Sequence, residues 1–204
     1  NMYGMDCPAA ACEKACLTCI RLDRSHSRLI GLMKRARRIP GVKKIFVRSG
    51  IRYDLAMESP GYLRELSVHH LSGLLKIAPE HVSPNVLKLM NKEGRPLEEF
   101  REMFSRINPS RRQHLRYYFM AAHPGSSQRE ARELARALRS MEKLGDRPAE
   151  GVQIFTPTPM TRSTCMYYTG RDPITGEEVF VPRTYAEKKS QRRMALSGAA
   201  GKRE

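Results

Sequence analysis

Apolar residues in this chain gather into short runs that alternate with longer amphipathic stretches. The short runs predict four buried strands, at residues 44–48, 74–79, 116–122 and 151–156. In the longer stretches apolar residues recur three or four positions apart, which is the period of a helix packed on one face. These stretches predict helices at residues 27–38, 60–68, 84–90 and 97–107, and from Ser127 to about Leu144.

Local signals support the helix starts. Ser59-Pro60 and Ser83-Pro84 each combine a capping residue with a proline suited to the first turn. Ser127-x-x-Glu130 has the form of a capping box. Strands separated by helices at intervals of roughly 30 to 40 residues indicate parallel strands joined by right-handed crossovers. The pattern therefore predicts an α/β fold of parallel strands with outer helices.

Parallel sheets of this kind bind ligands at the carboxyl ends of their strands. Six polar residues follow the predicted strands closely and are candidates for cofactor binding: Ser49, Arg52, Glu80, His81, His123 and Thr156. Ordinary turns between strands and helices also need polar residues, Gly and Pro, so a plain-turn interpretation stays open. Arg52, Glu80 and the two histidines carry ionisable groups that a turn does not require. His69-His70, at a predicted helix end, favours capping over metal binding.

Charge adds a second possibility. The 204 residues carry 37 Lys+Arg against 21 Asp+Glu, a formal net charge of +16. Two interpretations explain this excess equally well: a basic surface that is simply solvated, and weak, nonspecific nucleic-acid binding. Much of the excess lies in two helices and in the tail from Arg183 to Glu204; the helical residues are Lys34, Arg35, Arg37, Arg38, Arg129, Arg132, Arg136 and Arg139. No run of about 18 apolar residues is present, so no membrane partner is expected.

Four cysteines fall within thirteen residues: Cys7, Cys12, Cys16 and Cys19. No secretory signal precedes them, which disfavours a disulfide framework and favours a cytoplasmic location. Zinc sites prefer two close pairs separated by a longer gap, which is absent here. An iron–sulfur cluster needs thiolates from a short loop, which this spacing supplies. Iron–sulfur is therefore favoured over zinc, and both stay open.

A set of segments, in order along the chain, resembles the YgiQ-like radical SAM proteins, a largely uncharacterised family. The segments are Asn1-Met-Tyr-Gly, Gly41-Val-Lys-Lys, Ser49-Gly-Ile-Arg-Tyr-Asp-Leu, His69-His70, Leu75-Lys-Ile-Ala-Pro-Glu-His, Val86-Leu-Lys-Leu-Met, His123-Pro-Gly, Val152-Gln-Ile-Phe-Thr-Pro-Thr-Pro and Met166-Tyr-Tyr-Thr-Gly. The resemblance implies a partial (β/α) barrel of the radical SAM type. It also implies a 4Fe-4S cluster, S-adenosylmethionine as cofactor, an electron donor and a substrate that the family does not identify.

In that family the catalytic Cys-x3-Cys-x2-Cys loop lies upstream of the Asn-Met-Tyr-Gly segment, so the resemblance implies a fragment that begins after it and is inactive alone. The four cysteines then match a second, additional metal site. Cys12-x3-Cys16-x2-Cys19 has the catalytic spacing itself, but Thr18 stands where an aromatic or bulky apolar residue is usual. Whether this cluster is auxiliary or catalytic stays open.

Three regions are expected: a cysteine-rich metal-binding loop at 1–25, the partial barrel at 26–182 and a basic, partly disordered tail at 183–204. The favoured function is part of a radical SAM enzyme that reductively cleaves S-adenosylmethionine to a 5'-deoxyadenosyl radical. The alternative is a zinc-binding basic α/β module that contacts RNA.

Overall fold

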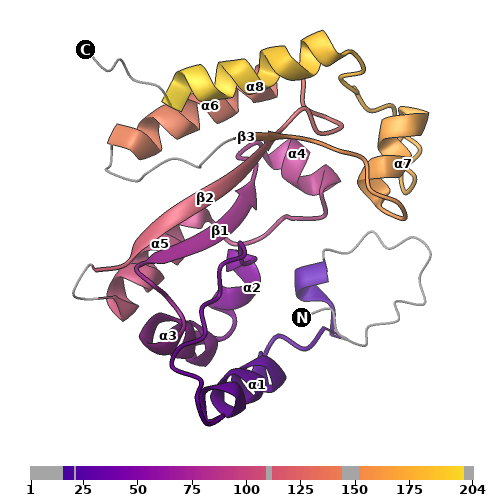
Figure 1. Ribbon diagram of the computed structural model, residues 1–204. Helices are drawn as coiled ribbons and strands as arrows, with labels where there is room; N and C mark the ends of the chain where they lie inside the picture. The colour runs from indigo at the N-terminus through magenta and orange to yellow at the C-terminus, as the bar shows by residue number, and fades with distance from the viewer. Residues whose placement is uncertain (1–15, 21, 109–111, 144–151, 200–204) are drawn as a thin grey trace. The chain divides into compact units, whose positions relative to one another are not determined.

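A computed structural model describes residues 16–20, 22–108, 112–143 and 152–199. Twelve elements lie in these ranges (Figure 1). The helices are η1 Cys16–Thr18, α1 Ser27–Arg37, α2 Tyr53–Met57, α3 Pro60–His69, α4 Pro84–Leu89, α5 Leu97–Ile107, α6 Gln128–Lys143, α7 Arg162–Thr169 and α8 Tyr185–Ala199; the strands are β1 Leu74–Glu80, β2 His114–Ala121 and β3 Val152–Ile154. No helix in these ranges is long and apolar enough to cross a membrane.

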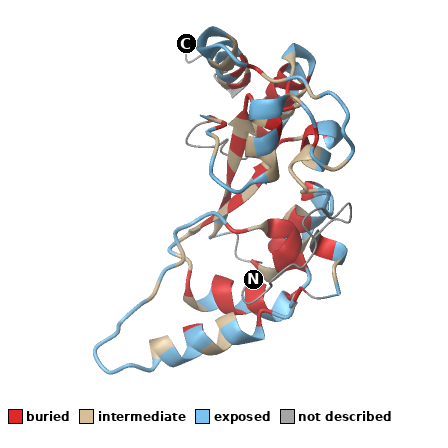
Figure 2. Ribbon diagram, turned by 90° about the vertical axis from the view of Figure 1, so that its right-hand side faces the viewer, coloured by how far each residue is buried: buried red, intermediate tan, exposed pale blue. Residues whose placement is uncertain are grey.

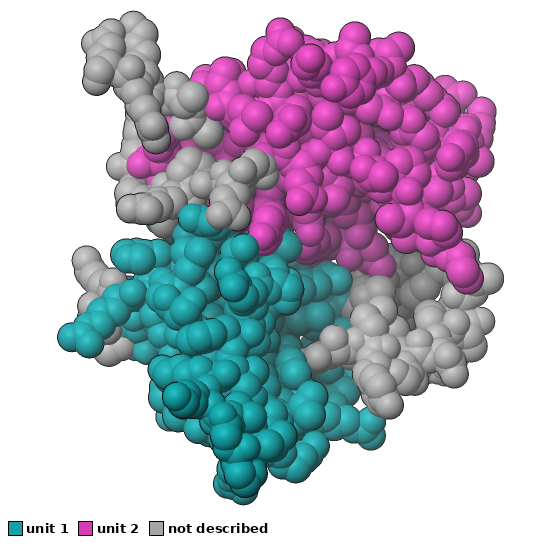
Figure 3. Space-filling model, in the orientation of Figure 1, with its two compact units in different colours: residues 1–7, 17–78, 94–116 teal, residues 8–16, 79–93, 117–204 magenta. Residues whose placement is uncertain are grey.

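The chain divides into two compact units (Figure 3). Unit 1 comprises residues 1–7, 17–78 and 94–116, and unit 2 comprises residues 8–16, 79–93 and 117–204. Strands β1 and β2 each begin in unit 1 and end in unit 2. The carboxyl ends of both strands therefore belong to unit 2.

The three strands form one sheet in the order β1-β2-β3, which confirms the parallel α/β prediction. β2 and β3 run parallel, with Phe119 opposite Val152 and Ala121 opposite Ile154. Buried residues alternate with half-buried ones along β1, and Figure 2 shows such red and tan bands on the strands of the sheet. This alternation places one face of the strand in the core, since successive side chains point to opposite faces.

The predicted strand at residues 44–48 was wrong. This segment is irregular, Phe46 is 43% exposed, and only Val47 makes a backbone hydrogen bond within it, to the His70 carbonyl. Parallel pairing with β1 occurs later, where Ile51 lies opposite Ile77 as a single bridge. The ladder cannot continue because α2 begins at Tyr53.

In unit 1, helices α2, α3 and α5 pack against one another, and α1 packs on α3. The residues of α5 that face the core are Leu97, Phe100 and Phe104, spaced three and four apart as an amphipathic helix requires. The predicted helices at 27–38, 60–68 and 97–107 are confirmed. Ser59 is the N-cap residue and Pro60 lies in the first turn, as predicted, but the Ser59 hydroxyl makes no capping bond and donates to the Ser25 carbonyl instead (2.7 Å).

In unit 2, α8 lies along α6 and also contacts β3 (Figure 1). Most of the stretch expected as a basic tail is therefore helix α8. Gln191 of α8 is buried and joins the loop after β2: its Oε1 accepts from the Ala122 N–H (3.1 Å) and its Nε2 donates to the Ser126 carbonyl (2.6 Å). These bonds satisfy backbone groups that a loop would otherwise leave unpaired.

The predicted helix at 84–90 is confirmed as α4, but Ser83 makes no side-chain cap. The capping box of α6 is confirmed: the Glu130 carboxylate accepts from the Ser127 N–H (2.9 Å), and the Ser127 hydroxyl accepts from the Arg129 N–H (3.1 Å). Burial raises the pKa of Glu130, but hydrogen bonds from the Ser127 hydroxyl and from backbone N–H groups, together with the charge of Arg129, outweigh it, so its pKa lies below the usual value.

Candidate functional site

The six candidate residues from the strand ends fall in both units. Ser49 and Arg52 belong to unit 1, and Glu80, His81, His123 and Thr156 belong to unit 2. The two groups differ in whether their polar side-chain atoms already have hydrogen-bond partners within the unit or are left for a ligand.

In unit 1, Arg52 already has an internal partner that the sequence patterns did not predict. Its Nε–H is shared between the two carboxylate oxygens of Asp54, at 2.9 and 3.0 Å. Asp54 is 1% exposed and also accepts from the Leu55 N–H. A Cβ at Gly94 would lie 2.6 Å from the Asp54 carboxylate, so only glycine permits this approach. Ser49 is exposed in the irregular segment before Ile51.

In unit 2, Glu80 is the last residue of β1 and has a left-handed backbone, with φ of 67°. Non-glycine residues adopt this conformation rarely, and such strain often accompanies functional sites. The Glu80 carboxylate accepts from the Lys92 ammonium at 3.2 Å. Ala122, directly after β2, shows the same feature with φ of 62°. Each strained residue precedes a buried histidine.

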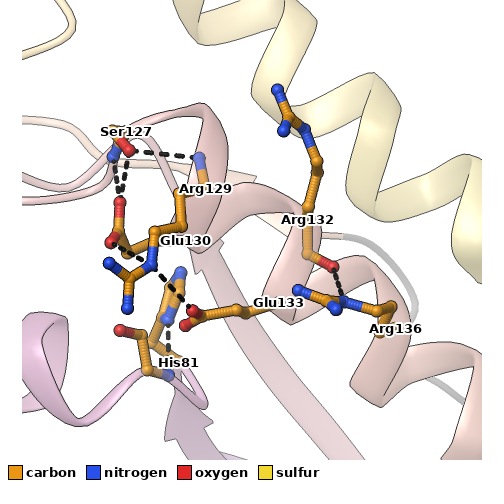
Figure 4. A network of polar contacts seen from close by, with 8 residues as sticks. His81, Ser127, Arg129, Glu130, Arg132, Glu133 and Arg136 are labelled. Atoms are coloured by element: carbon orange, nitrogen blue, oxygen red, sulfur yellow. Dashed lines mark hydrogen bonds and ion pairs between the residues drawn. The ribbon is translucent and has the colours of Figure 1, made fainter.

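His81 is 2% exposed, and its Nδ1 accepts from the Ser83 N–H at 3.0 Å. The hydrogen of the neutral ring must therefore be on Nε2, which has no hydrogen-bond partner among the described residues. Burial, reinforced by His123 and opposed by Glu130, lowers the pKa of His81 to about 4. Figure 4 shows the His81 ring beside Glu130. At neutral pH this side chain is an uncharged donor.

His123 is also 2% exposed and lies on the other strand end. Its Nδ1 donates to the Pro124 carbonyl (2.7 Å), because a carbonyl can only accept, and its Nε2 then accepts from the Ser163 hydroxyl (2.7 Å). Burial lowers the pKa of His123 to about 4. The Phe155 ring packs edge-on against the imidazole at 4.9 Å.

Ser163 is the site residue that the sequence patterns missed. It lies in α7, forty residues after His123, and no local motif marks it. Helix α7 itself was not predicted; its start is capped by Thr161, which accepts from the Thr164 N–H. The hydroxyl of Thr156, by contrast, reaches back to the Ile154 carbonyl at 3.4 Å.

Gly125 explains why the His123-Pro-Gly turn is tight. It has φ of 88°, and its N–H donates to the Phe180 carbonyl at 2.7 Å. A Cβ there would overlap the methyl end of the Leu89 side chain. The Leu89 methyl group can move aside, but the left-handed backbone would still strain any larger residue at this turn.

Of the four cysteine candidates, Cys7 and Cys12 lie outside the described residues. Cys16 begins η1, and Cys19 is partly buried against Leu17, Leu22 and Leu55. Within the ranges that the structure describes, no group of three His, Cys, Asp or Glu side chains is arranged to hold a metal ion. The proposed cluster ligands therefore stay a prediction.

His70 has the structural role that its position at a helix end indicated. It is the residue that ends α3 and is fully buried. Its Nδ1 faces the Ile45 carbonyl at 2.9 Å, and its Nε2 faces the Glu65 carboxylate at 3.4 Å. Arg37 pairs with the same carboxylate at 3.0 Å. Both ring nitrogens thus have acceptors inside unit 1.

Comparison with known proteins finds relatives that are much longer than this chain. Residues 150–196 match the model of a domain of unknown function, DUF3362. Over 94% of this chain, a UPF0313 protein of Methanosarcina acetivorans is 47% identical, and one of Fusobacterium nucleatum is 41% identical. A UPF0313 protein of Clostridium perfringens strain 13 is 45% identical over 89% of the chain. The matched stretch spans 27%, 36% and 28% of these three relatives.

Proposed function

We propose that this chain is part of a YgiQ-like radical SAM protein of the UPF0313 family. Support comes from relatives named UPF0313 proteins at 41–47% identity, because UPF0313 is the YgiQ-like family. The matched DUF3362 region fits the same assignment. Enzymatic activity, the cofactors and the substrate are all parts of this proposal.

The observation that carries a cofactor role is the unpartnered Nε2–H of His81. A buried donor without an acceptor costs about 1–3 kcal/mol, so a fold keeps one where a ligand supplies the missing acceptor. His81 follows the carboxyl end of β1, where parallel sheets bind their ligands. S-Adenosylmethionine fits this environment, since its carboxylate, ribose and adenine all carry acceptors.

When bound, the cluster and S-adenosylmethionine supply reductive cleavage to a 5'-deoxyadenosyl radical. The chain's own residues would position the cofactor. His81 would donate from Nε2, and the Glu80 carboxylate, held by Lys92, would accept from ribose hydroxyls or the amino group. His123 would hold the Ser163 hydroxyl at the neighbouring strand end. The low pKa values keep both rings neutral, so neither repels a cationic cofactor.

The metal part of the proposal assigns Cys7, Cys12, Cys16 and Cys19 as ligands of an iron–sulfur cluster. Anaerobically prepared protein should contain iron and sulfide and absorb broadly in the visible range. Cys12→Ala with Cys16→Ala should remove the iron and leave the far-ultraviolet circular dichroism unchanged. Cys165→Ala is the matched control, because this exposed thiol lies on α7 and should leave the iron content intact.

Unchanged iron in the double variant would contradict the ligand assignment. A colourless protein that binds zinc through these cysteines would favour the zinc-binding module instead. The chain alone, once reduced, should not form 5'-deoxyadenosine from S-adenosylmethionine. Detection of this product would mean that Cys12, Cys16 and Cys19 hold the catalytic cluster themselves.

A further inference from the structure

Helix α8 carries a concentrated positive charge. It contains Lys188, Lys189, Arg192 and Arg193 and a single acidic residue, Glu187. The Glu187 carboxylate is taken up at the helix start, where it accepts from the N–H groups of Arg183 (3.0 Å) and Thr184 (2.9 Å) and from the Thr184 hydroxyl. It is therefore a capping group, and the charge of the helix face stays positive.

The four cations of α8 divide into two pairs. Lys188 donates to the Tyr167 hydroxyl at 2.7 Å, and Arg192 donates to the Val152 carbonyl at 2.8 Å, so these two tie α8 to α7 and β3. Lys189 and Arg193 are exposed and have no carboxylate partner among the described residues. Their charge is available to a ligand that approaches from solvent.

Tyr185, Lys189 and Arg193 are four residues apart and so lie on one side of α8. The short side chains of Ala186 and Ser190 lie between them, and together the five residues line a hollow of about 380 Å³. The Tyr185 ring is 72% exposed, and the Lys189 ammonium lies 5.8 Å from its centre. A second hollow of about 330 Å³ continues along the helix; it is lined by Lys189, Arg192, Arg193, Leu196 and Ser197.

Helix α6, which packs on α8, adds further cations. Arg132, Arg136 and Arg139 are exposed and recur four and three residues apart on one face of α6. Figure 4 shows Arg132 extending from α6 toward α8. No ion pair joins these three arginines to a carboxylate in the described part of the chain. Both helices of this packed pair therefore expose cations to solvent on unit 2.

We infer that this face of α8 binds single-stranded nucleic acid, with Lys189 and Arg193 at phosphates and Tyr185 stacked on a base. Single strands are bound by cations that follow the backbone and by exposed aromatic rings that stack on bases. A duplex would not offer the face of a base to Tyr185. A membrane surface would require a broad apolar face, whereas the exposed residues of α8 are polar or small apart from Tyr185. The inference does not depend on the proposed radical SAM function.

The test is fluorescence anisotropy of the 204-residue chain with a labelled single-stranded oligouridylate of about 20 nucleotides. Lys189→Glu with Arg193→Glu should raise Kd at least about tenfold. The plot of log Kd against log salt concentration should also become shallower, by the amount expected for the loss of about two phosphate contacts. Tyr185→Ala should raise Kd about tenfold, and Tyr185→Phe should restore binding, because the phenyl ring still stacks. Circular dichroism checks that each variant folds.

The matched control is Lys34→Glu with Arg38→Glu at α1 in unit 1. These exposed residues are also four apart, and the double change removes the same charge. The control should raise Kd less than about threefold. Equal losses in both double variants would mean that binding follows net charge alone and would overturn the inference. It would also be overturned by equally tight binding of duplex RNA, by no effect of Tyr185→Ala, or by binding to phosphatidylserine vesicles without oligouridylate binding.

Discussion

His70 in unit 1 and His81 in unit 2 are both buried histidines next to an element end, yet their surroundings differ. His70 has an acceptor at each ring nitrogen, one from the Ile45 backbone and one from Glu65. His81 has one nitrogen paired with the Ser83 backbone and one with no partner among the described residues. The comparison separates a histidine that completes a fold from one that leaves a donor for a ligand.

The largest effect should come from pH. His81 and His123 are buried neutral with pKa values of about 4, below the value of about 6.5 expected when unfolded. Between these values the unfolded chain binds more protons, so stability is present above pH 6.5 and is lost as pH falls. We expect a loss of about 2 kcal/mol per histidine between pH 7 and pH 5 in urea unfolding.

His81→Gln with His123→Gln should flatten this pH dependence. The matched control is His114→Gln, since His114 is exposed at the start of β2 and its replacement should leave the slope unchanged. An unaltered slope in the double variant would show that other groups cause the acid sensitivity. The two buried histidines of unit 2 would then not differ from His70 in their effect on stability.

The second effect concerns the structural histidine. His70→Ala should lower the free energy of unfolding by about 3 kcal/mol, because it opens a cavity and removes one partner of the buried Glu65 carboxylate. His69→Ala, at the adjacent and partly exposed position, should cost less than about 1 kcal/mol. Thermal unfolding of the two variants measures the difference. Similar values for both would mean that the contacts of His70 contribute little.

The third effect should appear in cofactor affinity. In the full-length protein, Glu80→Ala and His81→Gln should each weaken S-adenosylmethionine binding about tenfold, the worth of one charge-assisted hydrogen bond. The exposed Glu93 is the matched control, and Glu93→Ala should leave affinity unaltered. Calorimetric titration gives the affinities. Wild-type affinity in the folded Glu80 variant would favour the plain-turn interpretation of the segment after β1.

The smallest effect concerns the hydroxyl that His123 holds. Ser163→Ala should destabilise the fold by about 1 kcal/mol, because the buried Nε2 loses its donor. Ser140→Ala, at an exposed position of α6, should have no measurable effect. Urea unfolding at pH 7 compares them. Equal stability of both variants would show that the hydroxyl contributes nothing to the position of the ring.

Sequence patterns alone predicted the features that depend on residues close together in the chain, such as helices and their caps. The period of apolar positions located α5 at 97–107 without error, and the Ser127-x-x-Glu130 capping box marked the start of α6. A second capping box, Thr184-x-x-Glu187, could have marked α8 in the same way. Helix signals lie within a few residues of one another, so they can be read before the chain is folded. Three strands were also found, because their runs are apolar enough to be buried.

Only the tertiary structure decided the contacts between distant segments. An extended run at 44–48 becomes a strand only if a partner lies alongside it, and β1 pairs instead with Ile51. The pairing of Ser163 with His123 and the bonds from Gln191 to the loop after β2 span 40 to 69 residues. The free donor of His81 likewise depends on burial by surrounding elements. Such contacts follow from which side chains the fold brings together, because hydrogen-bond satisfaction is a property of the packed interior and not of local sequence.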